Sequence, residues 1–179
     1  AVTLAAMRTG VAPDATATLT DLLSQLRVDV SQGRTRLNDE DVSEQIRLPE
    51  TTRNVRGYAD QPCVREALTR LQRDFAKGRD LVTEGRDQGT VVFPHAQCKF
   101  FLTATPEERA RRRYLDYQRS GKDIPIAVVQ ADQEARDRQD RERKLAPLMP
   151  APDAIEIDTT GMSEEDVLDH LVRQVRSLS

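Results

Sequence analysis

Residue types suited to phosphate and metal chemistry gather in the stretch "LVTEGRDQGTVVF", residues 81–93. We expect its apolar start to form a strand over 80–84, which ends at Glu84, Arg86 and Asp87. A carboxylate in that place can hold a Mg²⁺-bound water, and a guanidinium matches the geometry of phosphate. Asp87 can accept a hydrogen bond from an exocyclic amine. The alternative is an ordinary loop with an Arg–Asp ion pair.

A second candidate lies in "EARDRQDRERK", residues 134–144, where three charged residues share one helical stripe. Arg136, Asp140 and Arg143 are spaced i, i+4, i+7, so their side chains leave the same helix face. One hypothesis is that the arginines bind phosphate while Asp140 accepts hydrogen bonds from sugar hydroxyls. The alternative is a solvated helix face with local ion pairs.

A third candidate is the basic segment "ERARRRY", residues 108–114. Arg109, Arg112 and Arg113 share a helix face, where their like charges repel one another. An anion held between them would reverse that cost, and arginine clamps of this kind stabilise a phosphoryl group in transfer. A solvated basic face is the alternative.

The elements that would position these residues alternate between strands and helices. The expected helices are 1–9, Thr18 or Thr20 to Leu26, 62–77, 105–120, 125–145 and a final helix capped by Ser163. The expected strands are 80–84, 98–104 and 154–158, with a polar hairpin around Gly33 within 27–43 and a short helical turn within 40–47. This order predicts an α/β fold with a mostly parallel sheet. Ligands of such sheets bind beyond the carboxyl ends of the strands.

Composition narrows the class of protein. The 179 residues are 37% hydrophobic and 32% charged, and the net charge is -3. No window approaches the ~18 apolar residues of a membrane span, so no membrane partner is expected. Cys63 and Cys98 stand alone, which argues against a disulfide framework or a zinc site and predicts a reducing compartment, the cytoplasm. An arginine-rich RNA-binding module is a further hypothesis. The net charge and the absence of tryptophan count against a nucleic-acid partner.

Three motifs in order, "GRDxGTVVFP", "R-D-R-x-D-R-x-R" and "APL-x-P", resemble those of bacterial cytidylate kinases. The resemblance implies a P-loop NTPase core, in which helices flank a parallel sheet, over 1–17 and 58–179. It also implies a small α+β nucleotide-binding insert over 18–57. The implied reaction is transfer of the ATP γ-phosphoryl group, with Mg²⁺, to CMP or dCMP, giving CDP or dCDP. A monomer is expected.

The resemblance also implies roles for individual residues. Cytosine would be read by Arg65 and Asp87, and the acceptor phosphate would be bound by Arg86 and Arg143. Arg136 and Asp140 would contact ribose and phosphate. The lid over ATP would comprise Arg109, Arg112 and Arg113. Catalysis is expected from Arg86, Arg112 and Arg143, and Glu84 is expected to hold Mg²⁺ through water.

Two departures from the family pattern stand out. Arg56 occupies the place where the family has a serine that touches the base. The pattern G-x-x-x-x-G-K-[ST] does not occur in this sequence, so the first strand and P-loop are expected to be absent from this chain. They would lie before Ala1, in a segment of roughly 40 residues. A non-catalytic nucleotide-binding remnant is therefore the alternative to a kinase.

Overall fold

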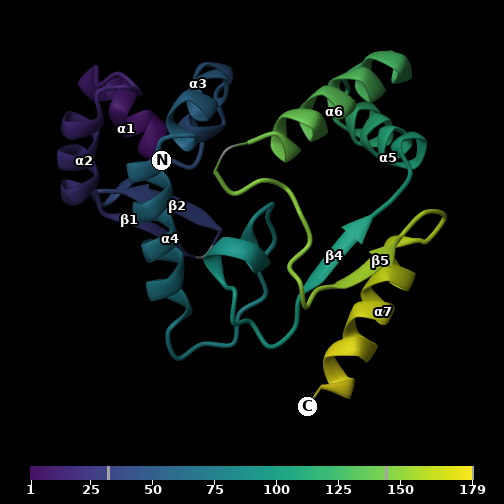
Figure 1. The fold of residues 1–179 in the computed structure, drawn as a ribbon. Coiled ribbons are helices and arrows are strands. Elements are labelled where there is room, and N and C mark those ends of the chain that lie inside the picture. The colour runs from purple at the N-terminus through teal and green to yellow at the C-terminus, as the bar shows by residue number, and fades with distance from the viewer. Residues whose placement is uncertain (32, 144, 179) are drawn as a thin grey trace. The chain divides into compact units, whose positions relative to one another are not determined.

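A computed structural model describes residues 1–31, 33–143 and 145–178 of the chain (Figure 1). The chain forms two compact units, Ala1–Asp80 and Leu81–Ser179. Among the helices of the described residues, none combines the length and the apolar character that a membrane-spanning helix requires.

The first unit packs helices against a small antiparallel sheet. Its elements are α1 (Val2–Thr9), α2 (Thr16–Gln25), β1 (Val28–Ser31), β2 (Arg34–Leu37), β3 (Glu40–Asp41), the 3₁₀ turn η1 (Gln45–Arg47), α3 (Pro49–Ala59) and α4 (Pro62–Ala76). Strands β1 and β2 pair with Ser31 opposite Arg34, and Gly33 has a φ of 73°. Glycine adopts this left-handed conformation without strain. The predicted hairpin and helical turn are confirmed.

Apolar side chains from α1, α2, α3 and α4 form the core of this unit. Leu19 is fully buried, and it packs in one cluster with Val2, Ala6, Tyr58 and Val64. The hydroxyl of Tyr58 donates to the carbonyl oxygen of Val11 at 2.7 Å, so the buried ring brings no unsatisfied polar atom into the core.

The second unit has α/β architecture with parallel strands. Its elements are the π-helical turn η2 (Gln88–Val92), β4 (Phe100–Thr103), α5 (Pro106–Arg119), α6 (Ile126–Arg141), β5 (Ile155–Asp158) and α7 (Glu164–Ser177). Strands β4 and β5 pair in parallel, with Phe100 opposite Ile155. Helices α5 and α6 pack side by side (Figure 1). The predicted fold class is confirmed, because parallel strands are joined through helices.

Two helices of this unit begin where their capping residues predict. The Thr105 hydroxyl accepts from the backbone NH of Glu108, and Pro106 stands in the first turn of α5. Ser163 and Asp166 form a capping box at the start of α7. Caps of this kind satisfy backbone NH groups that have no partner within the helix.

The strand predicted over 80–84 is wrong. Residues 79–84 are irregular, and Val82 is 99% exposed. A run of apolar residues becomes a strand only where a neighbouring strand satisfies its backbone groups, and no strand of the described residues pairs with this run. Glu84, Arg86 and Asp87 therefore do not follow a strand.

Three helix predictions also need correction. Helix α2 starts at Thr16 without a side-chain cap, earlier than the predicted threonine caps. Helix α6 ends at Arg141 rather than 145. Helix α3 was not predicted, because its few apolar residues give little periodicity. Pro49 in its first turn was the available signal.

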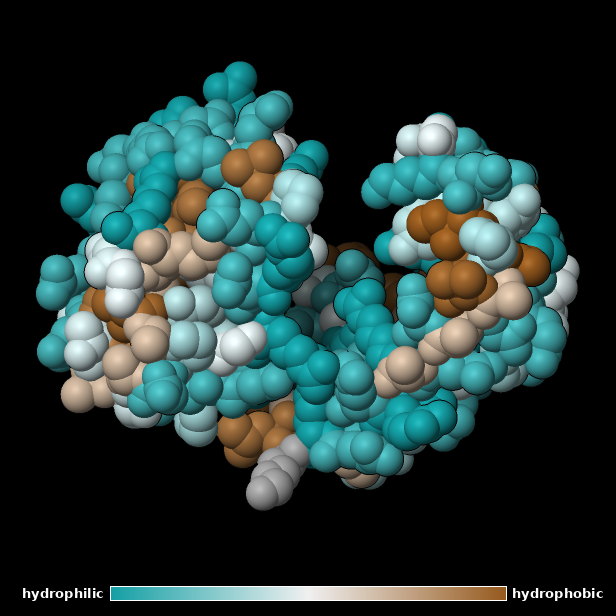
Figure 2. Space-filling view, turned by 90° about the horizontal axis from the view of Figure 1, so that it is seen from above, coloured by the Kyte–Doolittle hydropathy of each residue, from teal (hydrophilic) through white to brown (hydrophobic). Residues whose placement is uncertain are grey.

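The surface is largely hydrophilic on the face that Figure 2 shows, with separated hydrophobic patches. This agrees with the charged fraction of 32%. The boundaries predicted for the insert, residues 18–57, stay a prediction.

Candidate active site

The segment that carries Glu84, Arg86 and Asp87 leads into the π-helical turn η2. The carbonyl oxygen of Asp87 accepts from the backbone NH groups of Val91 at 2.9 Å and Val92 at 3.1 Å. The bond from Val92 spans five residues (i→i+5) and widens the turn, a geometry often found at functional sites. Glu84 is exposed, whereas Arg86 and Asp87 are half-buried.

A buried lysine anchors the chain beside η2. Lys99 is 8% exposed, and its Nζ donates to Pro94 O at 2.6 Å and to both carboxylate oxygens of Asp153. A Cβ on Gly89 would lie 3.3 Å from Cδ of Lys99. Gly89 therefore permits a close approach of the backbone to the lysine side chain.

Arg86 and Arg143 converge on one buried carboxylate. Nη1 of Arg86 lies 2.6 Å from Oδ2 of Asp140, and Nη2 of Arg143 lies 2.8 Å from Oδ1. Asp140 is only 2% exposed. The ion pairs offset part of the cost of burying this charge, while Oδ2 accepts no hydrogen bond among the described residues. The burial of Asp140 contradicts the alternative of a solvated helix face, whereas the exposed Arg136 and the local pair of Asp140 with Arg143 agree with it.

Asp137, to which no role was assigned from the sequence, extends this ion-pair cluster to helix α5. Its Oδ2 pairs with Nη1 of Arg109, and its Oδ1 lies 3.9 Å from Nη1 of Arg86. Asp137 and Asp140 are three residues apart and therefore leave the same face of α6. That spacing was the available signal. We call the set Arg109, Asp137, Arg86, Asp140 and Arg143 the ionic chain.

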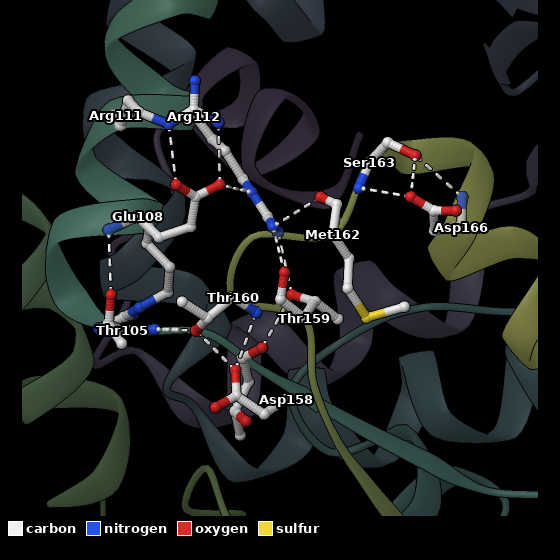
Figure 3. A network of polar contacts seen from close by, with 12 residues as sticks. Thr105, Glu108, Arg111, Arg112, Asp158, Thr159, Thr160, Met162, Ser163 and Asp166 are labelled. Carbon is white, nitrogen blue, oxygen red and sulfur yellow. Dashed lines mark hydrogen bonds and ion pairs between the residues drawn. The ribbon is translucent and has the colours of Figure 1, made fainter.

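Arg112 joins helix α5 to the loop after β5 (Figure 3). Its Nε donates to Glu108 at 2.7 Å. Its Nη1 donates to Oγ1 of Thr159 at 3.0 Å, and its Nη2 donates to the carbonyl oxygens of Thr159 at 2.6 Å and Met162 at 3.3 Å. Thr159 is 4% exposed, so these bonds reach into the interior of the unit.

Glu108 neutralises part of the positive charge on α5. It accepts from Nε and Nη2 of Arg111 at 2.8 and 2.9 Å and from Arg112. The hydrogen bonds from Arg111, and then those from Arg112, lower the pKa of this carboxyl to about 2. The repulsion expected among the α5 arginines is therefore offset by carboxylates of the protein.

The three arginines of the predicted lid have different partners. Arg109 pairs with Asp137, and Arg112 binds Glu108 and the loop after β5. Arg113 is exposed, with its guanidinium 4.9 Å from the centre of the Tyr117 ring. The structure therefore does not bring the three guanidinium groups together, and their roles toward ATP stay predictions.

The loop after β5 is ordered by its own side chains as well as by Arg112 (Figure 3). Asp158 Oδ1 accepts from the backbone NH and the hydroxyl of Thr160 at 2.9 and 2.6 Å, and these bonds lower the pKa of Asp158. The Thr160 hydroxyl in turn accepts from the backbone NH of Thr105 at 3.0 Å.

The remaining predicted site residues lie apart from the ionic chain or in the other unit. Arg136 is exposed on α6, on the predicted stripe but outside the ion pairs described above. Arg65 lies in the first turn of α4 and Arg56 on α3, both in the first unit. The pairing of Arg65 with Asp87 around a base therefore stays a prediction.

The cluster is suited to binding a phosphate group. Two buried carboxylates hold three arginines, which leaves one positive charge in excess, and the arginine side chains of the ionic chain are 27–32% exposed. No group of three or more His, Cys, Asp or Glu that could hold a metal occurs among the described residues. A lone carboxylate such as Glu84 fits a Mg²⁺ ion that arrives on a nucleotide, since Mg²⁺ is commonly held by phosphates and water.

Comparison with known proteins places the chain among phosphoryl-transfer enzymes. A family model described as cytidylate kinase matches residues 1–177. The cytidylate kinase of Rhodopirellula baltica is 44% identical over 176 residues, which are 98% of this chain and 77% of that protein. That of Geobacter sulfurreducens is 43% identical over 98% of this chain and 77% of the relative. That of Desulfitobacterium hafniense is 51% identical over 74% of this chain and 57% of the relative.

Proposed function

The chain belongs to the cytidylate kinase family, and from this premise we propose that it transfers the γ-phosphoryl group of ATP to CMP or dCMP. The products are CDP or dCDP. The observation that supports this most is the family match across residues 1–177. Membership gives no support to the alternative of a non-catalytic remnant.

The acceptor phosphate binds at Arg86 and Arg143. A phosphate monoester carries about −1.5 to −2 charges near neutral pH, and the planar guanidinium group can bind it through two parallel hydrogen bonds. Both side chains already face Asp140, with distances of 2.6 and 2.8 Å. Their remaining donors are directed to the phosphate while the buried carboxylate keeps the pair in register. Arg136, which is exposed, contacts the ribose and phosphate. Asp140 is 2% exposed and acts on the phosphate through the two arginines that it holds.

The base is chosen by Asp87 and Arg65. The carboxylate of Asp87 accepts from the 4-amino group of cytosine, and Arg65 donates to the ring acceptors. Uracil presents a carbonyl oxygen in place of the amine, which would leave two acceptors facing each other. A site built around such a hydrogen bond discriminates strongly against the analogue that lacks the donor.

The donor enters as Mg²⁺–ATP beside helix α5. Arg109 and Arg113 neutralise its phosphates. Glu84 would hold the Mg²⁺ ion of the nucleotide through a water, and the ion would offset charge on the phosphates. Arg112 is predicted to act on the moving phosphoryl group, although in the described structure it donates to Glu108, Thr159 and Met162.

The reaction follows from positioning and charge stabilisation. An oxygen of the CMP phosphate attacks the γ-phosphorus of ATP, the bond to the β,γ-bridging oxygen breaks, and ADP leaves. Phosphoryl transfer of this kind needs aligned reactants and preorganised positive charge more than covalent chemistry by the protein. Arg86 and Arg143 supply that charge on the acceptor side. They also hold the attacking oxygen of the CMP phosphate in position.

A direct test uses the full-length product of the gene. CDP formation from CMP and Mg²⁺–ATP is followed in a coupled assay, with dCMP and UMP as competing acceptors, and CMP binding is measured by calorimetry. We expect turnover with CMP that falls sharply in Arg86→Ala but persists in Arg138→Ala, which removes an exposed arginine of α6 outside the ionic chain. If the unmodified protein neither binds CMP nor forms CDP, the proposal is refuted.

A further inference from the structure

The carboxylate of Asp137 lies between two arginines that the proposed function assigns to different substrates. Arg86 belongs to the acceptor-phosphate site, and Arg109 belongs to the helix beside ATP. Asp137 Oδ2 pairs with Nη1 of Arg109, and Oδ1 is 3.9 Å from Nη1 of Arg86. One side chain of α6 therefore contacts both halves of the proposed reaction.

The carboxylates of this arrangement are more deeply buried than its arginines. The side chain of Asp137 is 12% exposed and that of Asp140 is 3% exposed, whereas Arg86 and Arg109 are 32% and 31% exposed. The carboxylates thus lie behind the guanidinium groups, which retain surface that an anion can reach. A guanidinium has five donors, so it can keep a carboxylate on one edge while it takes a phosphate on another.

Arg109 depends on Asp137 for its orientation. Its Nε is buried and meets no hydrogen-bond acceptor among the described residues. A buried donor without an acceptor disfavours the conformation that contains it. The ion pair with Asp137 is therefore what holds the guanidinium group in place, and a change at Arg109 is felt first by that carboxylate.

Arg86 divides its attraction between two carboxylates at unequal distances. Nη1 of Arg86 lies 2.6 Å from Oδ2 of Asp140 but 3.9 Å from Oδ1 of Asp137. The main partner of Asp137 is Arg109. If Arg109 turns to a nucleotide or is removed, the Asp137 carboxylate loses that partner and its attraction for Arg86 grows, because a buried charge is costly without a partner.

We propose that Asp137 is a positioning residue that couples the acceptor-phosphate site to helix α5, by sharing its carboxylate between Arg86 and Arg109. The inference rests on the proposed function. It requires no structural change beyond rotation of side chains. Its consequence is that removal of Arg109, far along the chain from Arg86, alters CMP binding through Asp137.

The test is a double-mutant cycle on CMP affinity. The dissociation constant of CMP is measured by calorimetry, without ATP, for the full-length protein and for Arg109→Ala, Asp137→Asn and the double variant. We expect Arg109→Ala to weaken CMP binding about fivefold or more, since site-to-site couplings are commonly of that size. In the Asp137→Asn background the same change should alter the affinity by less than about twofold, as independent sites do.

The control variant is Arg119→Ala, on the same helix but in an exposed ion pair with Asp116, and it should leave CMP affinity unchanged. Equal effects of Arg109→Ala with and without Asp137, or no effect in either background, overturn the inference while CMP binding itself stands. Failure of the unmodified protein to bind CMP would instead count against the proposed function. If Arg109→Ala melts below the assay temperature, Arg109→Gln, which keeps the side-chain stem, completes the same cycle.

Discussion

Replacement of Arg112 by alanine removes the side chain that joins helix α5 to the loop after β5. The lost contacts are those from Nη1 and Nη2 to Thr159 at 3.0 and 2.6 Å and to Met162 at 3.3 Å. Glu108 keeps its hydrogen bonds from Arg111, so its charge does not become isolated. The loss of stability therefore comes from the hydroxyl and carbonyl oxygens of Thr159, which lose their hydrogen bonds from Arg112.

The expected loss follows from those contacts. A hydrogen bond contributes about 0.5 to 1.5 kcal/mol net, and the Arg112 side chain is 38% exposed, so water replaces part of what is lost. Two good bonds and one long bond then give a decrease of about 2 kcal/mol in the free energy of unfolding. For a chain of this length that corresponds to a melting temperature lower by roughly 4 to 8 °C.

Thermal and urea unfolding followed by circular dichroism measure this directly, with Arg111→Ala as the matched control. Arg111 lies on the same helix and donates to Glu108 in an ion pair at the surface, so its removal should change the stability little. An Arg112→Ala protein that unfolds like the wild type, yet loses turnover at unchanged KM for CMP, would refute the reasoning. It would favour direct action of Arg112 on the phosphoryl group.

Three further predictions each concern the replacement of one side chain. Asp87→Asn should shrink the ratio of kcat/KM for CMP over UMP, measured in the coupled assay, and an unchanged ratio removes Asp87 from base reading. Because hydrogen bonds from arginines hold the pKa of Glu108 at about 2, below the ordinary 4.5, its stability advantage over Glu108→Gln should be complete above about pH 4.5 and disappear as pH falls toward 2. Denaturant unfolding across that range tests the sign, and a constant difference contradicts it. Ser163→Ala should destabilise the protein by about 1 kcal/mol in the same assay through loss of the α7 capping box, whereas Ser177→Ala, at the other end of the helix, should cost less.

The sequence determined the elements whose signals are local. The caps at Thr105 and Ser163 predicted the starts of α5 and α7, because a side chain satisfies backbone NH groups within its own helical turn. The turn at Gly33 was predicted because glycine adopts the left-handed conformation without strain. The apolar runs of β4 and β5 predicted strands, and each run has the other as its pairing partner. The motifs around Arg86 and Asp140 also indicated the family before any geometry was known.

Tertiary structure alone decided which charges meet. Nothing in the spacing of α6 shows that Asp140 is buried against Arg86, which is remote in sequence, or that Asp137 pairs with Arg109 on α5. The apolar residues at 80–84 look like a strand in isolation, but strand formation depends on a hydrogen-bonding neighbour that a local pattern does not contain. Long-range ion pairs and strand pairing share this property, since each needs a partner brought close by the whole fold.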